Sequence, residues 1–276
     1  MFTNIEDFGK YVQGLEMSIS LSALEPSITQ ARDEIVKSLG VDIIDKLLDT
    51  EAIAPRVKAA IANYAMYRYL IFWSTSKNNT DQSLYKYQYE AIKNEYISIF
   101  WSSMDAIFTW LDASDLEEWK ESSVYTLRQS LLVKSALEFD RYFQIDKSEY
   151  FFSKVQFLIS KITADDIEPR IKSLKDPSGR VLDISKRALC YKVMAQAVML
   201  FDVTELPKSI RNDVAHEFTK ESSLMQIREK IKSILMSDVE KYYSDLEAEV
   251  LAATKNASLS SFVNQNEEKN NFYMSI

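Results

Sequence analysis

Residues 81–111 have the sequence DQSLYKYQYEAIKNEYISIFWSSMDAIFTWL. Their aromatic and aliphatic side chains recur mainly at the three- and four-residue spacing that places side chains on one face of an α-helix. The members of this face are Tyr85, Tyr89, Ile92, Tyr96, Phe100, Ile107 and Leu111. We therefore expect a long helix here, with an aromatic face that packs against other helices.

The composition of the whole chain favours the same architecture. Its 276 residues include only 4 Gly and 5 Pro, against average usage of about 7% and 5%. Because turn-rich β folds need glycine at positive φ, this scarcity predicts long helices joined by few loops. The hydrophobic fraction of 46% and the charged fraction of 27% are those of a globular protein with a substantial core. The predicted fold class is all-α.

Further helices are predicted on both sides of residues 81–111. Their ranges are 24–39, 41–49, 55–73, 124–143, 149–161, 185–203 and 222–252. Pro26 suits the first turn of its helix, and Gly40 stands where a C-terminal cap belongs. Residues 163–166 have the pattern of a capping box, and residues 176–179 form the strongest predicted turn.

Short motifs recur in the same order in the two halves of the chain. Residues 8–13 (FGKYVQ) are matched by 139–144 (FDRYFQ), and residues 24–28 (LEPSI) are matched by 167–171 (IEPRI). The apolar helices and the long charged helices then follow in the same order, which we interpret as a tandem duplication. The predicted units are a first helical repeat (1–112), a second helical repeat with its linker (113–252) and an extended C-terminal tail (253–276).

Charge and cysteine content argue against several classes of function. With 33 basic against 41 acidic residues and a net charge of −8, the chain is poorly suited to gripping a nucleic-acid backbone, and we expect no specific nucleic-acid binding. Its apolar stretches are too short for a membrane span, and its N-terminus lacks the pattern of a secretory signal. The single Cys190 excludes an internal disulfide and is expected to be buried.

The familiar motifs of phosphate binding and hydrolysis are absent from the sequence. With one histidine, a metal site built on two histidines is impossible. Asp213, His216 and Glu217 could share a helical face and hold a metal, but a solvated helix start is the simpler interpretation. The acidic residues of 165–168 are interpreted as charges that complement a helix dipole. We therefore predict no enzyme activity, no cofactor and no metal site.

One short motif supports an alternative function. Residues 211–216, RNDVAH, resemble the RN-x-x-x-H signature of the helical HEPN ribonucleases. The resemblance implies a nuclease or toxin in which Arg211 binds an RNA phosphate and His216 acts as general acid/base. The acidic balance, the length and the duplication of this chain depart from that family, so we keep the nuclease as the second hypothesis.

A resemblance over nearly the whole chain supports the leading hypothesis. It rests on the FxxYV segment, the LEPxI helix that ends at Leu39-Gly40, the repeated helices, Leu206-Pro207 and the C-terminal sequence NNFYM. Together these resemble a family of uncharacterised proteins from gut Bacteroidetes and their phages, similar to the helical head–tail connector proteins of tailed bacteriophages. The resemblance implies a non-enzymatic ring subunit of the virion, made in the bacterial cytoplasm. Its partners would be copies of itself and neighbouring head or tail proteins such as the portal.

The C-terminal tail carries the predicted partner-binding residues. Its polar composition leaves too little apolar surface to offset the entropy of ordering it, so we expect it to be mobile when alone. It nevertheless ends in Phe272, Tyr273 and Met274, which would anchor it to a neighbouring subunit. A helical adaptor of unknown partner is the remaining alternative.

Overall fold

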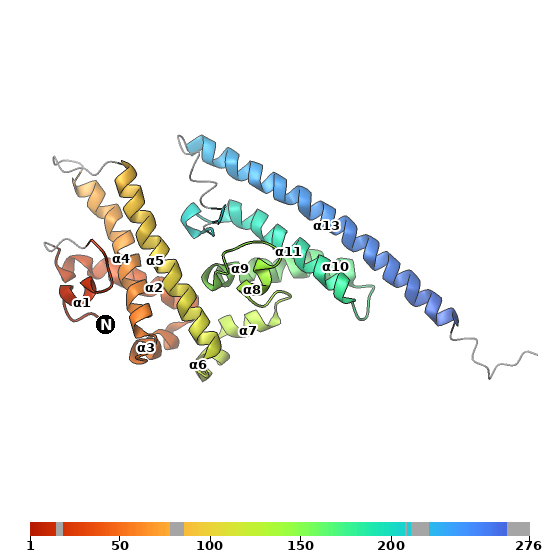
Figure 1. Ribbon diagram of the computed structural model, residues 1–276, viewed down its shortest axis with the longest axis horizontal. Helices are drawn as coiled ribbons and strands as arrows, with labels where there is room; N and C mark the ends of the chain where they lie inside the picture. The colour runs from red at the N-terminus through yellow and green to blue at the C-terminus, as the bar shows by residue number, and fades with distance from the viewer. Residues whose placement is uncertain (15–18, 78–85, 208, 211–220, 264–276) are drawn as a thin grey trace, which may run out of the picture.

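The computed structural model describes residues 1–14, 19–77, 86–207, 209–210 and 221–263. The structure is 80% helical, and no strand occurs in the part of the chain that it describes. The predicted all-α fold class is therefore confirmed. Figure 1 shows two groups of helices side by side, with one very long helix along the edge of the second group.

The first group is formed by the N-terminal part of the chain. Its helices are α1 (Ile5–Gly9), α2 (Leu21–Leu39), α3 (Val41–Asp49), α4 (Ala54–Lys77) and α5 (Lys86–Ala113). Both α2 and α5 pack against α4, and α3 lies under them (Figure 1). Gly40, at a φ of 101°, makes the sharp turn between α2 and α3 that a side chain would strain. Pro26 lies inside α2, beyond the first turn in which we expected it, because Ser20 begins the helix earlier.

The second group follows a short helical linker. The linker helices are α6 (Glu117–Glu121) and α7 (Ser123–Ser130). The group itself contains α8 (Ala136–Asp140), α9 (Glu149–Ile162), the π-helical turn η1 (Thr163–Ile167), α10 (Glu168–Ile171), α11 (Gly179–Leu200), the 3-10 turn η2 (Val203–Glu205) and α13 (Glu221–Val263). Helix α11 is its centre and packs against both α9 and α13.

An aromatic seam joins the two groups. Trp101 of α5 stands edge-on to Tyr150 of α9, with ring centroids 5.1 Å apart, and stacks on Phe151 at 6.4 Å. Phe100 makes a second edge contact with Tyr150 at 5.3 Å. All four rings are buried, and one hydrophobic core runs through the seam from one group into the other. The two groups are therefore one packed body.

Two predicted features of the second group are wrong. The helix expected over 124–143 is divided into α7 and α8, because Ser135 caps α8 by accepting a hydrogen bond from the Glu138 amide. The capping box expected at 163–166 is a π-helical turn, so the chain stays helical from α9 into α10. A π-turn places residues five apart on one face, and Ile162 and Ile167 are accordingly both buried.

Helix α13 is far longer than the helix that supports it. It has 43 residues against 22 in α11, or about 64 Å against about 33 Å at 1.5 Å per residue. Its buried side chains are Leu235, Val239, Tyr243, Leu246 and Val250. After Val250 no described side chain of the helix is buried, and Figure 1 shows this end pointing away from the rest of the molecule. The prediction that an extended tail begins at 253 is wrong for residues 253–263, which are helical.

Some features recur in both groups and some do not. Helices α1 and α8 are each five residues long, each is capped by a polar side chain, and each buries a phenylalanine of the repeated motif, Phe8 or Phe139. In contrast, Pro26 lies within α2, whereas its motif partner Pro169 lies in α10, after α9 has ended. The LEPxI match therefore does not place its two copies in corresponding helices.

The long helices α5 and α13 share a pattern of burial. Five of the buried positions of α5, Tyr96, Phe100, Met104, Ile107 and Leu111, recur 139 residues later at the positions that are buried among the described side chains of α13. The seam positions do not follow this pattern: at the same spacing, Trp101 corresponds to the exposed Glu240. A similar difference separates α9 from α2. Tyr150 lies two residues after Ser148, the cap of α9, whereas the residue two positions after Ser20, the cap of α2, is the exposed Ser22.

Candidate functional site

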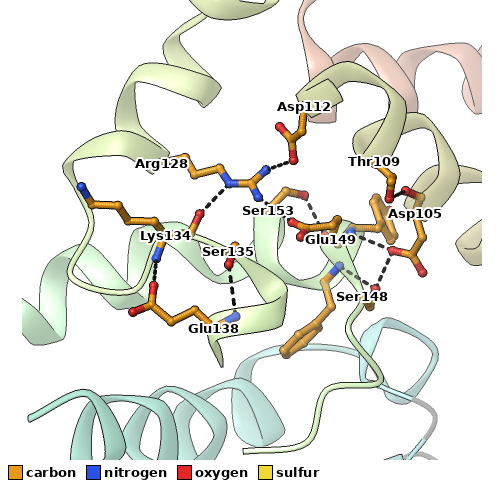
Figure 2. Close-up of polar contacts among 12 residues, drawn as sticks. Asp105, Thr109, Asp112, Arg128, Lys134, Ser135, Glu138, Ser148, Glu149 and Ser153 are labelled. Carbon is orange, nitrogen blue, oxygen red and sulfur yellow. Dashed lines mark hydrogen bonds and ion pairs between the residues drawn. The ribbon is translucent and has the colours of Figure 1, made fainter. Parts of the chain in front are cut away.

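A buried arginine from the linker connects the two helical groups. Arg128 of α7 has a side chain that is only 8% exposed. Its Nη1 atom lies 2.8 Å from Asp112 Oδ2 at the end of α5, and its Nη2 atom lies 2.9 Å from Glu149 Oε2 at the start of α9. Its Nε atom donates to the Lys134 carbonyl at 2.7 Å. Figure 2 shows the guanidinium between these acceptors.

A half-buried carboxylate completes this junction. Asp105 of α5 accepts two hydrogen bonds on Oδ1, from the Ser148 hydroxyl and from the Tyr150 amide, each at 2.9 Å (Figure 2). Burial raises the pKa of Asp105, although these hydrogen bonds act in the opposite direction. Burial likewise raises the pKa of Glu149, against the lowering effect of Arg128. The hydrogen bonds and ion pair described for these two carboxylates are made within the chain, and we interpret the junction as a structural joint.

A cavity of about 250 Å³ lies beside this joint, between the two groups of helices. Its walls are Glu34, Tyr64, Tyr67, Arg68, Ile97, Phe100, Trp101, Tyr150, Lys154, Asp202 and Glu205. At its centre, Lys154 Nζ of α9 lies 2.7 Å from Glu205 Oε1 and 3.6 Å from Glu34 Oε1. We call this space the seam cavity. It is the strongest candidate for a functional site among the described residues, because charged and aromatic side chains converge on it from both groups.

Tyrosine hydroxyl groups add neutral hydrogen-bond donors to the walls of the seam cavity. Burial is the largest cause that raises the pKa of Tyr64 to about 12, and the charge of Glu34 adds to it. Burial and the same carboxylate hold the pKa of Tyr150 well above its ordinary value. Both phenols are therefore protonated at neutral pH, and the Tyr150 hydroxyl donates to Glu34 Oε1 at 3.3 Å.

A groove of about 500 Å³ continues from the seam cavity along α7 and α9. The two spaces share Glu34, Lys154 and Glu205. Beyond these residues the groove is lined by polar side chains and by four apolar ones, Val124, Leu127, Phe157 and Phe201. Leu127 and Phe157 are 38% and 52% exposed. We call it the seam groove.

None of the site residues predicted from the sequence lies in the part of the chain that the structure describes. Arg211 and His216 of the nuclease hypothesis, with Asp213 and Glu217, lie outside the described residues. The predicted tail anchors Phe272, Tyr273 and Met274 also lie outside them. These assignments remain predictions.

Two other sequence interpretations can be compared with the structure. Cys190 is completely buried in α11, and burial holds the pKa of its thiol well above the ordinary value, so its predicted packing role is confirmed. In the acidic segment 165–168, the Asp166 carboxylate lies 2.8 Å from Lys192 Nζ of α11. This carboxylate therefore helps to hold η1 against α11.

Sequence reasoning did not identify the residues of the joint or of the seam cavity. Their partners come from distant parts of the chain: Arg128 and Glu149 are 21 residues apart, and Glu34 and Tyr150 are 116 apart. No local motif marks such pairs. The available signals were charged residues within predicted helices, among them Arg128 in 124–143 and Lys154 in the apolar helix 149–161.

Comparisons with known proteins add no assignment, because no protein-family model, curated protein or solved structure matches the chain. Within the described ranges, no three His, Cys, Asp or Glu side chains are grouped so that they could hold a metal ion. The described helices also include none that is long and apolar enough to span a membrane.

Proposed function

We propose that the chain is a non-enzymatic structural protein of a phage or prophage virion, a head–tail connector subunit that forms a ring under the portal. The proposal starts from the order of motifs that resembles connector proteins. It is supported by a body of two helical groups with recurring features, namely the capped helices α1 and α8 and the common burial pattern of α5 and α13. Its partners would be further copies of the chain and neighbouring head or tail proteins.

The observation that carries the proposal is the unsupported end of α13. Residues 251–263 continue the helix for 13 residues beyond the buried Val250, and none of the side chains described after it, those of 251–255, is buried. Isolated helices of this length are marginal in water. Leu251 is nevertheless 56% exposed on this segment. A long projecting helix with an exposed leucine is suited to packing against a neighbouring subunit, which would bury that side chain.

The proposal is tested by measuring assembly of the purified full-length chain. We expect mass photometry and negative-stain electron microscopy to reveal closed rings, either of the chain alone or on addition of a portal protein from the same phage or prophage genome. Leu251→Asp should abolish ring formation and leave the thermal midpoint unchanged, because the side chain is exposed within one copy. Deletion of residues 264–276 should have the same effect if Phe272, Tyr273 and Met274 anchor the tail.

A matched control separates this interface from general surface charge. Ser233→Asp adds the same charge at an exposed position in the supported part of α13 and should leave assembly unchanged. A chain that stays monomeric at all concentrations and does not bind the portal would overturn the connector proposal. RNA cleavage that is lost in Arg211→Ala and in His216→Ala would establish the nuclease in its place.

A further inference from the structure

The seam cavity already holds one ammonium group, that of its own Lys154. This ammonium group forms ion pairs with two carboxylates. Its Nζ atom lies 3.6 Å from Glu34 Oε1, in the first group of helices, and 2.7 Å from Glu205 Oε1, in the second. The ring of Tyr150 adds a cation–π contact, with its centroid 5.1 Å from Nζ. Carboxylates and aromatic faces are the two kinds of group that attract a cation, and here they converge.

The remaining walls favour a second cation. Three carboxylates line the cavity, on Glu34, Asp202 and Glu205, against two basic groups, on Arg68 and Lys154. Five aromatic side chains supply the other surfaces: Tyr64, Tyr67, Phe100, Trp101 and Tyr150. An excess of negative charge among aromatic rings suits a guanidinium or ammonium group, whereas an acidic ligand would meet three like charges.

The seam groove indicates that the cation belongs to a polypeptide. The groove opens from the cavity at Glu34, Lys154 and Glu205. It continues past polar side chains and an apolar set formed by Val124, Leu127, Phe157 and Phe201. Leu127 and Phe157 expose 38% and 52% of their surface there. A segment with a basic side chain followed by apolar ones would place its charge in the cavity and its apolar side chains on the groove.

We infer that the seam cavity binds the basic side chain of a protein partner, with arginine preferred, and that the seam groove binds the apolar residues beside it. Arginine is preferred because its planar guanidinium can bond two carboxylates and stack on aromatic rings at once. The incoming cation shares Glu34 and Glu205 with Lys154, so the two cations compete. The inference does not depend on the connector proposal, since any partner with this pattern would fit.

The test uses fluorescein-labelled peptides and the full-length chain, with binding measured by fluorescence anisotropy. The probe is Ala-Leu-Arg-Leu-Ala with blocked ends, and its matched control has citrulline in place of arginine, which keeps the shape and removes the charge. We expect the citrulline peptide to bind at least about tenfold more weakly, the loss associated with one charge-assisted hydrogen bond. Equal binding of the two peptides would overturn the inference.

Variants of the cavity distinguish a cation site from an anion site. Glu205→Gln should weaken binding of the arginine peptide by about tenfold, while Asp45→Asn, an exposed carboxylate outside the cavity, should not change it. Lys154→Met should tighten binding, because it removes the competing ammonium group. If Lys154→Met instead abolishes binding, or if a glutamate peptide binds better than the arginine peptide, the cavity binds anions and the inference is wrong. Circular dichroism melts establish that each variant is folded.

Discussion

At the scale of single residues, the carboxylate of Asp105 joins the two groups of helices by hydrogen bonds, but burying its charge lowers the stability of the fold. Its Oδ1 atom accepts hydrogen bonds from Ser148 and Tyr150 across the seam. Because burial raises its pKa above the ordinary value of 3.8, the ionised form is less favourable in the folded chain than in the unfolded chain. The loss of folding stability that ionised Asp105 causes reaches its full size at pH values above the folded pKa. It disappears when the pH falls below about 3.8.

This cost predicts a pH-dependent effect of Asp105→Asn. The asparagine keeps an Oδ1 acceptor and carries no charge, so the variant should unfold at a higher temperature than the parent at pH 7. The difference should shrink as the pH falls through the folded pKa and vanish near pH 3.8. Asp105→Ala is the control: without an acceptor, it should lose about 1–3 kcal/mol of stability at pH 7. A lower midpoint for Asp105→Asn than for the parent at pH 7 would contradict this account.

At the scale of helices, α13 is supported over one part of its length and unsupported beyond it. Leu246 is completely buried against α10 and α11, whereas Leu251 is 56% exposed one and a half turns later. Leu246→Ala should therefore lower the free energy of unfolding by about 2–5 kcal/mol. Leu251→Ala should change it by less than about 0.5 kcal/mol. Chemical denaturation of the monomeric chain measures both, and similar losses would show that α13 is supported as far as Leu251.

Much of the helical arrangement could be predicted, because helices leave local signals. The range 41–49 agrees with α3, and Ser148 before the apolar residues of α9 is the observed cap. The failures occur where tertiary contacts override those signals. The π-turn η1 replaces a predicted helix start, since Ile167 reaches the core only if the chain stays helical. Similarly, nothing in the composition of residues 253–263 indicated that α13 would continue through them.

At the scale of the whole molecule, the aromatic seam holds the two groups of helices together. Trp101 contacts both Tyr150 and Phe151 across it and is only 7% exposed. Trp101→Ala should lower stability by about 3–5 kcal/mol. It should also weaken the coupling between the groups, so that the single thermal transition broadens or divides in calorimetry. Trp110, which is only partly buried, provides the control, and Trp110→Ala should keep one transition. One sharp transition in Trp101→Ala would mean that the linker alone couples the groups.

Polar residues on α2 and α13, at the positions that correspond to the aromatic seam residues of α9 and α5, have a consequence for solubility. If two packed groups were identical in sequence, each would offer its neighbour the same adhesive face, and the protein would be at risk of runaway polymerisation. In this chain the adhesive face is used once. On α13, the position that corresponds to Trp101 of α5 is occupied by Glu240, so α13 cannot form the same seam with a second copy. On α2, the position that corresponds to Tyr150 of α9 is occupied by Ser22, so α2 cannot form it either. The outward surfaces of α2 and α13 therefore do not repeat the aromatic seam, which disfavours growth into a fibre through this kind of contact. Contacts between copies would use other surfaces.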